Sequence, residues 1–410
     1  MKIVILNTSE RSGGAAVAAG RLGKALERAG IQVEKLVRDD TWLNRFRFYW
    51  ERLIIFLCNH LNRKNLFAVS IANTGTDLSR HPSVKDADII HLHWINQSFL
   101  SLKDIEELVK QNKPIVWTMH DMWPCTSICH YAWGCERFYH ECGKCPFLKS
   151  NNLHDLSYYV WKKKGFLKAS DIQLVAVSSW LAEQAKKSSL TKDLEVVVIP
   201  NAIDVSVFFK KEQIEIRKKF SFPLDKKIVL MGAARLDDPI KGFEFLKDAL
   251  NILLCARNDI LLVLFGAIKN DKPFFDHLTV PYLSLGLLSD NNQIAELYSA
   301  ADVTVVPSFY ETFGQTIIEA MACGCPAVSF NNSGQTDIID HKINGYVASY
   351  KDASDLANGI QWVLEHEDRL ALSDACVKKV QENYTEEVVA GQYMALYEKL
   401  LKENKTAGCN

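Results

Sequence analysis

Short runs of Val, Ile and Leu recur along the chain, with longer stretches of helical pattern between them. In the first half they predict strands at Lys2–Leu6, Gln32–Val37, Asp88–Leu92, Pro114–Thr118, Gln173–Val177 and Glu195–Ile199. In the second half they predict strands at Lys227–Gly232, Ile260–Phe265, Tyr282–Leu285, Val303–Val306, Ala327–Phe330 and Gly345–Val347. Apolar runs without polar alternation are typical of strands buried on both faces of a parallel sheet. Two successive sets of alternating strands and helices therefore predict two doubly wound α/β domains.

The two domains are expected to join around Pro200, because proline cannot continue a central strand and the residues after it favour turns. We therefore place an N-terminal domain at residues 1–199 and a C-terminal domain at residues 200–384. Apolar residues spaced three to four apart predict a final helix in residues 385–410. It is expected to end in a loose polar tail at Lys402–Asn410.

Composition and charge describe an ordinary globular protein of 410 residues, with 48% apolar and 24% charged residues. The formal net charge of −1 gives no reason to expect nucleic acid as a partner. The apolar run at the N-terminus stops at Asn7, which indicates a first strand rather than a secretory signal. No apolar stretch reaches the roughly 18–20 residues of a membrane span. The 11 cysteines, an odd number, fit a reducing compartment. We therefore expect a cytoplasmic protein that is soluble or at most rests on a membrane surface.

Ligands of open α/β sheets bind beyond the carboxyl ends of the strands, so the cleft between two such domains is the expected active site. The sequence contains no G-x-G-x-x-G motif, which argues against a dinucleotide-dependent dehydrogenase. It also lacks G-x-x-x-x-G-K-[ST], which argues against a P-loop NTPase.

The segment Pro307–Pro326 carries the most informative pattern. It follows the predicted strand Val303–Val306, so it begins at a strand's carboxyl end. Gly314 lets the backbone approach a ligand, and a helix is predicted to start there. The N-terminus of that helix is a good phosphate site, because its N–H groups and positive dipole end face the ligand. Glu311 and Glu319 flank this site, and carboxylates suit hydroxyl-rich ligands because they accept hydrogen bonds from sugar hydroxyls.

This segment resembles the Glu-x7-Glu signature of retaining glycosyltransferases of family 4, which have the GT-B fold. The resemblance covers nearly the whole chain and is also carried by Ser12–Ala15, Ile199–Asp204, Arg235–Gly242 and Thr118–Trp123 with the cysteines after it. The last feature is similar to enzymes of bacterial capsule, exopolysaccharide and colanic-acid-type assembly. The resemblance implies two Rossmann-like domains facing a central cleft, with the C-terminal helix crossing back to the N-terminal domain. The N-terminal domain would bind the acceptor and the C-terminal domain the nucleotide sugar.

The resemblance also implies roles for matching residues. Glu311 would contact the donor sugar and Glu319 the ribose, while Arg235 and Lys241 would hold the diphosphate. The expected donor site comprises Gly13, Gly14, Arg235, Lys241, Glu311, Thr312, Phe313, Gly314, Gln315 and Glu319. Fixed cations and a helix N-terminus stabilise the charge that builds on a leaving diphosphate. Thr312 and Gln315 depart from the commonest family pattern, which leaves the donor sugar open.

His120 follows the predicted strand Pro114–Thr118 at its cleft end, where the family has a histidine near the donor sugar and phosphate. We therefore expect His120 to act in catalysis together with Arg235, Lys241 and Glu311. Asp121 is a candidate to orient the His120 ring, and we assign His93 and Asp121 to the acceptor side. His91 and His93 would face the same way on a strand, as metal ligands do. No third ligand is evident, so we interpret this pair as the floor of the cleft near the acceptor.

Four cysteines in one short segment suggest a structural metal: Cys129, Cys135, Cys142 and Cys145. The last two have the spacing of a zinc knuckle, with a glycine that eases the turn. In a reducing compartment four thiolates favour zinc over an iron–sulfur cluster. Unliganded thiols or a disulfide pair are the alternatives. A zinc site would stiffen a cysteine-rich insertion at about residues 123–150.

Residues 41–66 interleave aromatic and basic side chains. Such segments can rest on anionic membranes, where the enzyme would meet a lipid-linked acceptor at the inner face. The alternative is an amphipathic helix that packs on its own domain.

Together these features predict a retaining, hexosyltransferase-type enzyme. It would move a sugar from a UDP- or GDP-linked donor to a glycan or lipid-linked acceptor in cell-surface polysaccharide biosynthesis, with no catalytic cofactor. Two alternatives stay open. A nucleotide-sugar 2-epimerase would share the GT-B architecture, and a non-enzymatic binding protein organised by zinc would explain the cysteines.

Overall fold

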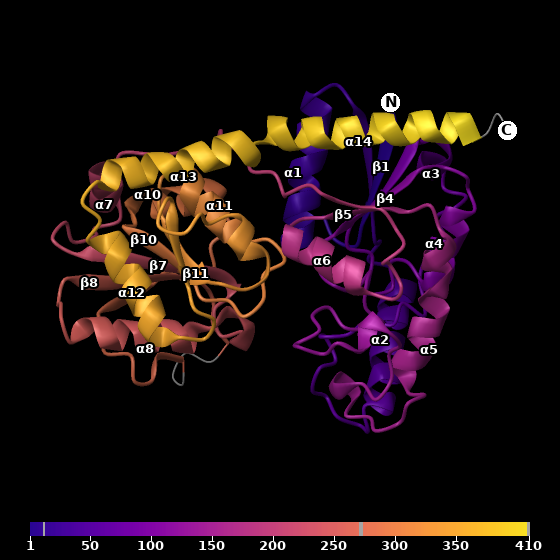
Figure 1. The fold of residues 1–410 in the computed structure, drawn as a ribbon, viewed down its shortest axis with the longest axis horizontal. Coiled ribbons are helices and arrows are strands. Elements are labelled where there is room, and N and C mark those ends of the chain that lie inside the picture. Colours follow the sequence, from indigo (N-terminus) through magenta and orange to yellow (C-terminus); the bar gives the residue numbers. More distant parts are fainter. Residues whose placement is uncertain (11–12, 270–273, 408–410) are drawn as a thin grey trace. The chain divides into compact units, whose positions relative to one another are not determined.

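The computed structural model describes residues 1–10, 13–269 and 274–407. The chain forms two compact units, of which the first comprises Met1–Pro200 with Val389–Asn410 and the second Asn201–Val388. Each unit contains one six-stranded parallel sheet with helices packed around it (Figure 1). This architecture confirms the predicted α/β fold of two doubly wound domains. Among the described residues, no helix combines the length and the apolar character needed to cross a membrane.

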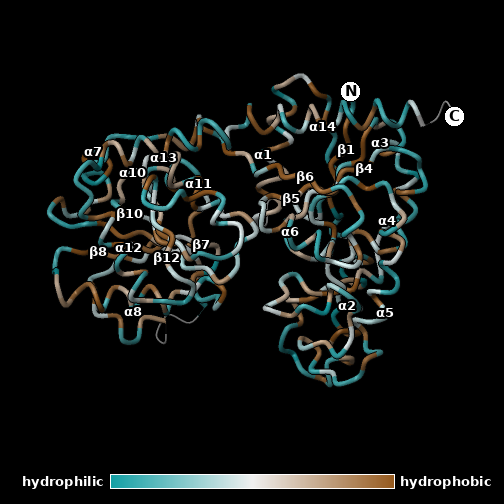
Figure 2. Tube along the Cα trace, in the orientation of Figure 1, coloured by the Kyte–Doolittle hydropathy of each residue, from teal (hydrophilic) through white to brown (hydrophobic). Residues whose placement is uncertain are grey.

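The sheet of the first unit has the strand order β2-β1-β3-β4-β5-β6. Its strands are β1 (Lys2–Asn7), β2 (Gln32–Val37), β3 (Ile89–Leu92), β4 (Ile115–Met119), β5 (Gln173–Ala176) and β6 (Val196–Val198). Neighbouring strands are parallel throughout. The inner strands β3, β4 and β5 are buried along their length, whereas the edge strands β2 and β6 are partly exposed. Figure 2 shows that the strands of this sheet are largely hydrophobic, including the edge strand β6, whose three residues are all valine.

The helices around this sheet begin at sequence signals of the expected kind. They are α1 (Gly14–Arg28), α2 (Trp42–Cys58), α3 (Pro82–Asp86), α4 (Leu102–Val109), α5 (Leu156–Lys163), α6 (Ser179–Lys187) and the short turns η1 (Arg137–Tyr139), η2 (Pro146–Leu148) and η3 (Lys164–Ala169). Ser101 and Asp104 form a capping box at the start of α4. Thr41 caps α2 through a hydrogen bond from the Asn44 amide.

The sheet of the second unit has the order β12-β11-β10-β7-β8-β9. Its strands are β7 (Lys227–Arg235), β8 (Ile260–Ala267), β9 (Tyr282–Ser284), β10 (Val303–Val306), β11 (Ala327–Phe330) and β12 (Gly345–Ala348). The surrounding helices are α7 (Gln213–Lys219), α8 (Phe243–Leu254), α10 (Asn291–Ala300), α11 (Gln315–Ala322), α12 (Ala353–Leu364) and α13 (Arg369–Asn383), with the turns η4 (Pro239–Lys241) and η5 (Ser333–Asp337). Buried residues of the strands form one core with the inner faces of α8 and α12.

The twelve predicted strands are all present, and their ends differ from the predicted ends by at most three residues. The prediction of a loose tail from Lys402 is wrong, because α14 (Glu386–Ala407) continues through it. Lys and Glu favour helix, and Lys399 lies 4.0 Å from Glu403 one turn further on. Residues 408–410 lie outside the described ranges. The portion of α14 from Val389 onwards belongs to the first unit.

Candidate active site

Lys241 and Glu311 form the centre of the candidate site in the second unit. The Lys241 Nζ lies 2.7 Å from the Glu311 Oε1, and both side chains are partly buried. Burial disfavours the charged amine, but the charge and hydrogen bond of Glu311 outweigh it, so the pKa of Lys241 is raised above its ordinary value. The two side chains are 70 residues apart in sequence, so the fold brings them together.

The loop that carries Lys241 docks closely against the loop that follows β10. Gly242 has a φ of +68°, and a Cβ there would lie 2.0 Å from the Pro307 carbonyl oxygen. The Phe309 amide donates to the Ile240 carbonyl at 2.8 Å. Only glycine permits this approach, and the approach sets Lys241 beside Glu311.

A second loop holds Glu311 from the other side. The Glu311 amide donates to the Ser333 hydroxyl at 3.0 Å, and its carbonyl accepts from the Gly334 amide at 2.7 Å. Gln335 is buried and donates to the Phe330 carbonyl at 3.0 Å. Our sequence reasoning missed these residues. Ser333 and Gly334, which favour turns after the strand Ala327–Phe330, were the available signal.

Helix α11 begins beside this pair at Gln315, as predicted from Gly314. Gly314 is the N-cap, with a φ of +119° and no side chain that could cap the helix. Phe313 is buried, with its ring 5.6 Å from that of Tyr384, so its backbone rather than its side chain is available to a ligand. Thr312 is buried as well, while Glu319 on the first turns of the helix is partly exposed. The arrangement offers a helix N-terminus next to a carboxylate and an ammonium group.

Arg235 lies at the end of β7, a strand that pairs with β10. It therefore lies at the same sheet edge as the Glu311 loop. Its exposed side chain pairs with Asp237 at 3.2 Å, separately from the ion pair between Lys241 and Glu311. Its role at a diphosphate stays a prediction.

The first unit presents a comparable helix start after β1. Gly13 is the N-cap of α1, with a φ of +91° and no side chain that could cap the helix. Within the described residues, a Cβ added at Gly13 or Gly14 would meet nothing within 4 Å. Ser12 lies outside the described residues.

The predicted histidines form a buried network with the C-terminal helix. His93 Nδ1 lies 2.8 Å from His120 Nε2, and the two rings stack. His91 lies between two hydroxyls, with Nε2 2.8 Å from Thr118 and Nδ1 2.8 Å from Tyr397. Thr118 in turn lies 2.8 Å from the Tyr393 hydroxyl. The sequence analysis predicted the final helix but gave no indication of these contacts of Tyr393 and Tyr397.

These three histidines are neutral at physiological pH. Burial lowers the pKa of His91 to about 3 and that of His120 to about 4. It lowers the pKa of His93 well below its ordinary value. Each neutral ring has one N–H and one bare nitrogen, so His93 and His120 share a single proton across their contact. The Nε2 of His93 is buried and has no hydrogen-bond partner within the described ranges.

Asp121 contacts different residues from those we expected. It accepts hydrogen bonds from the Trp94 indole and the Trp123 amide, both at 2.8 Å, and pairs with His130 at 2.6 Å. His120 contacts His93, and the orientation of the His120 ring by Asp121 stays a prediction. Both residues lie in the bend that follows the end of β4 at Met119.

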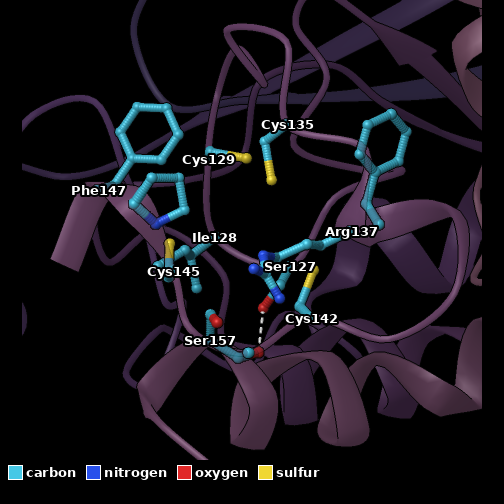
Figure 3. A pocket seen from close by; sticks show the side chains of 12 residues that line it. Ser127, Ile128, Cys129, Cys135, Arg137, Cys142, Cys145, Phe147 and Ser157 are labelled. Carbon is cyan, nitrogen blue, oxygen red and sulfur yellow. Dashed lines mark hydrogen bonds between the residues drawn. The ribbon is translucent and has the colours of Figure 1, made fainter. Parts of the chain in front are cut away.

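The four cysteines of the predicted zinc cluster line one pocket, together with Arg137. Figure 3 shows the thiols of Cys129, Cys135, Cys142 and Cys145 around this space and Arg137 reaching toward it. Burial raises the pKa of Cys142 to about 12 and that of Cys145 to about 11, so both thiols are protonated. Across the part of the chain that the structure describes, no group of three or more Cys, His, Asp or Glu side chains is arranged to hold a metal. The geometry therefore gives no support to a zinc cluster, and zinc stays a prediction.

Lys164 is fully buried beside this pocket and was not anticipated from the sequence. Its amine donates to the carbonyls of Trp123 at 2.6 Å and Thr126 at 3.0 Å. Burial lowers the pKa of Lys164 to about 7, although nearby thiols such as Cys125 and Cys129 oppose this shift. Four thiolates on a divalent ion would carry a net charge of −2, which Lys164 and Arg137 could offset.

Two family models match the chain, one in each half. Residues 12–207 match the model of glycosyltransferase family 4, and residues 212–382 match that of glycosyl transferases group 1. Because the matched ranges together take in most of the chain, the protein is a glycosyltransferase.

Curated relatives carry glycosyltransferase and synthase names. The chain is 22% identical to N-acetyl-alpha-D-glucosaminyl L-malate synthase of Bacillus anthracis, over 96% of each chain. It is 31% identical to N,N'-diacetylbacillosaminyl-diphospho-undecaprenol alpha-1,3-N-acetylgalactosaminyltransferase of Campylobacter jejuni, over 56% of this chain and 61% of that protein. It is 22% identical to the capsular polysaccharide biosynthesis glycosyltransferase CapM of Staphylococcus aureus, over 60% and 66%.

Solved structures share the fold. Sucrose-phosphate synthase from Thermosynechococcus elongatus aligns with a TM-score of 0.71 at 20% identity, over 98% of this chain and 99% of that one. The Anabaena protein HepE, in complex with UDP and glucose, aligns with a TM-score of 0.62 at 17% identity, over 97% and 99%. These likenesses confirm the GT-B fold predicted from the sequence.

The buried histidines predict an unusual titration. Because burial lowers their pKa values, His91 and His120 should stay neutral from pH 7 down to pH 5, where an unperturbed ring with a pKa of about 6.5 is mostly protonated. We expect NMR of ¹⁵N-labelled histidine to show neutral rings for both residues at pH 5. The denatured protein is the control, since its rings titrate normally. Protonation of either ring near pH 6.5 in the folded protein would contradict the buried network.

Elemental analysis tests the zinc site that the cysteine spacing suggested. That prediction requires protein purified under reducing conditions to hold close to one zinc ion per chain. Cys142→Ser should lose it, whereas Cys58→Ser, an exposed cysteine outside the pocket, should keep it. A zinc content far below one ion per chain in the reduced wild type would contradict the zinc prediction and show that the four cysteines are unliganded thiols.

Proposed function

We propose that this glycosyltransferase retains the anomeric configuration of its donor and moves a hexose from a nucleoside-diphosphate sugar to a glycan acceptor. The observation that carries the proposal is the Lys241–Glu311 pair beside the N-terminus of α11. It combines a cation, a carboxylate and oriented backbone N–H groups. These are the groups that a diphosphate joined to a sugar requires.

In the proposed donor complex the ion pair exchanges partners. The diphosphate takes the Lys241 ammonium and the helix N-terminus, which releases Glu311 to accept hydrogen bonds from sugar hydroxyls. Arg235 reaches the diphosphate from the neighbouring strand end, and Glu319 binds the ribose. The HepE structures with UDP and with UDP-glucose support this class of donor, since HepE shares the fold. UDP- and GDP-linked sugars are both compatible with the site.

The reaction breaks the bond between the anomeric carbon and the diphosphate oxygen and forms one to an acceptor oxygen on the same face. The acceptor proton passes to an oxygen of the departing diphosphate, so no cofactor is consumed. Charge grows on the diphosphate, where Lys241, Arg235 and the α11 N-terminus stabilise it. His120 is neutral and fixed by His93, so it can donate to or accept from the sugar without adding a charge.

The proposed acceptor is a lipid-linked glycan of cell-surface polysaccharide assembly, met on the cytoplasmic side of a membrane. Two relatives support this choice by their names. The Campylobacter jejuni relative is named for a diphospho-undecaprenol substrate and the Staphylococcus aureus relative for capsular polysaccharide. His93 and Asp121, at the carboxyl edge of the first sheet, are assigned to this acceptor side.

A panel of sugar nucleotides tests the donor proposal. A ligand present at 100 times its dissociation constant stabilises the folded protein by about 2.7 kcal/mol, which gives a visible shift in melting temperature. We expect UDP- or GDP-linked sugars to raise the melting temperature and the matching free sugars to leave it unchanged. Release of nucleoside diphosphate would then identify a transferase, whereas interconversion of the free sugar nucleotide would identify an epimerase. No shift with any sugar nucleotide would contradict the donor site.

Substitutions at the ion pair test the assignment of residues. Lys241→Ala and Glu311→Gln should each lower the rate of nucleoside diphosphate release by about 100-fold or more, since each removes a fixed group that acts on the donor. The matched control is Lys219→Ala, because Lys219 forms a 2.7 Å ion pair with Glu296 on the surface of the same unit. Near-normal rates in both site variants, with the folded state intact by thermal melting, would overturn the assignment.

A further inference from the structure

Helix α2 has its polar and apolar faces reversed relative to an ordinary surface helix. Surface helices bury their apolar stripe and expose polar residues. In α2 the buried residues are Asn44, Glu51, Arg52 and Ile55. The exposed large apolar residues are Trp42, Leu43, Phe46, Tyr49, Trp50, Leu53 and Leu57, of which Trp42 is 78% and Tyr49 68% exposed. Helix α2 does pack on its own domain, which was the alternative raised by the sequence, but it packs through this polar face and leaves the apolar face exposed.

Polar contacts fix this orientation. Glu51 and Arg52 form a buried ion pair at 2.8 Å. The Glu51 carboxylate accepts hydrogen bonds from the amides of Ile71 at 2.7 Å and Ala72 at 3.1 Å. Arg52 donates to the Val69 carbonyl at 3.0 Å. Turning the helix to bury its aromatic side chains would strip these charges of their partners, at a high free-energy cost.

The outward face is a continuous stripe. Exposed apolar positions recur every three or four residues from Trp42 to Leu57, which is one side of a helix about 25 Å long. Exposed Leu61 and Phe67 extend the apolar surface beyond the helix. The rings of Phe46 and Trp50 stack at 6.3 Å between centroids. A contiguous apolar surface of this kind marks an interaction site.

We propose that this face of α2 rests in the headgroup region of an anionic lipid bilayer. Trp and Tyr prefer the boundary between water and hydrocarbon, and this stripe contains both. Residues 41–66 contain five basic residues, of which Arg52 is buried against Glu51 and Arg45 pairs with Asp40 at 2.6 Å. The exposed Arg63 and Lys64 supply positive charge next to the stripe. The face is thus apolar and aromatic with basic neighbours, which complements an anionic membrane better than a second copy of the same basic face.

This inference extends the proposed function, since a lipid-linked acceptor would be met at such a surface. It depends on α2 alone, and its test requires no turnover. Vesicle binding with an inactive donor site, or turnover without vesicle binding, would therefore separate the two proposals.

Vesicle sedimentation tests the surface. We expect the wild-type chain to sediment with vesicles of phosphatidylglycerol and phosphatidylcholine, and to sediment much less with phosphatidylcholine alone. The triple variant Trp42→Ser, Phe46→Ser, Tyr49→Ser should bind anionic vesicles at least about tenfold more weakly, because it removes most of the aromatic area. Arg63→Glu with Lys64→Glu should weaken binding and abolish its dependence on salt.

Tyr159→Ser is the matched control, because Tyr159 is an aromatic residue of the same unit that is 55% exposed on another helix. It should bind vesicles like the wild type, and all variants should keep the wild-type melting temperature, since the altered side chains are exposed. Equal binding to neutral and anionic vesicles, or no binding, would overturn the proposal. A dimer in light scattering that the triple variant abolishes, without vesicle binding, would assign the stripe to a second copy of the chain.

Discussion

Parallel strand pairing is the constraint on which the candidate sites of this protein depend. It brings the carboxyl ends of neighbouring strands to one edge of each sheet, so residues far apart in sequence emerge side by side. In the second unit β7 and β10 are neighbours, and the loops that follow them bring Lys241 to Glu311. In the first unit β3 and β4 are neighbours, and His93 and His120 meet directly after them. The chemistry of each site then follows from which side chains occupy those positions.

The two units place opposite kinds of polar groups at these edges. The second unit presents a charged pair at a partly exposed position, where the two charges can be redistributed onto a ligand. The first unit presents neutral rings, because burial makes protonated imidazole unfavourable. Hydroxyls from α14 meet one nitrogen of His91 and the hydroxyl of Thr118. A charged pair of the first kind suits phosphate binding. Neutral buried rings suit hydrogen bonding in a site that is shielded from water. The histidine network also extends into α14, where Tyr393 and Tyr397 contact strand residues that lie 275 and 306 residues earlier in the chain.

The sequence was sufficient to predict the strands and the start of α11, because buried parallel strands are continuous apolar runs and Gly314 is a local helix signal. Contacts between loops that lie far apart in the sequence were harder to predict. Ser333 marks a turn in the sequence, but neither it nor Tyr397 has a local pattern that reveals its distant partner, and the contact between Asp121 and His130 was not anticipated either. The four cysteines line one pocket, but their spacing does not show whether the thiols converge on a metal, and the geometry does not support the predicted zinc site. The roles of Glu311 and Lys241 came from family resemblance, while their contact depends on the close approach at Gly242.

The completion of the first unit by α14 affects when the protein can fold during synthesis. The sheet of this unit ends at β6, but the hydroxyls beside His91 and Thr118 lie in the last 22 residues of the chain. Until those residues leave the ribosome, the buried histidine and threonine lack these partners and Tyr393 and Tyr397 are absent from the core. A nascent chain will therefore finish the second unit before the first, although the first is translated earlier. For the same reason, a fragment that stops at Pro200 is an incomplete domain.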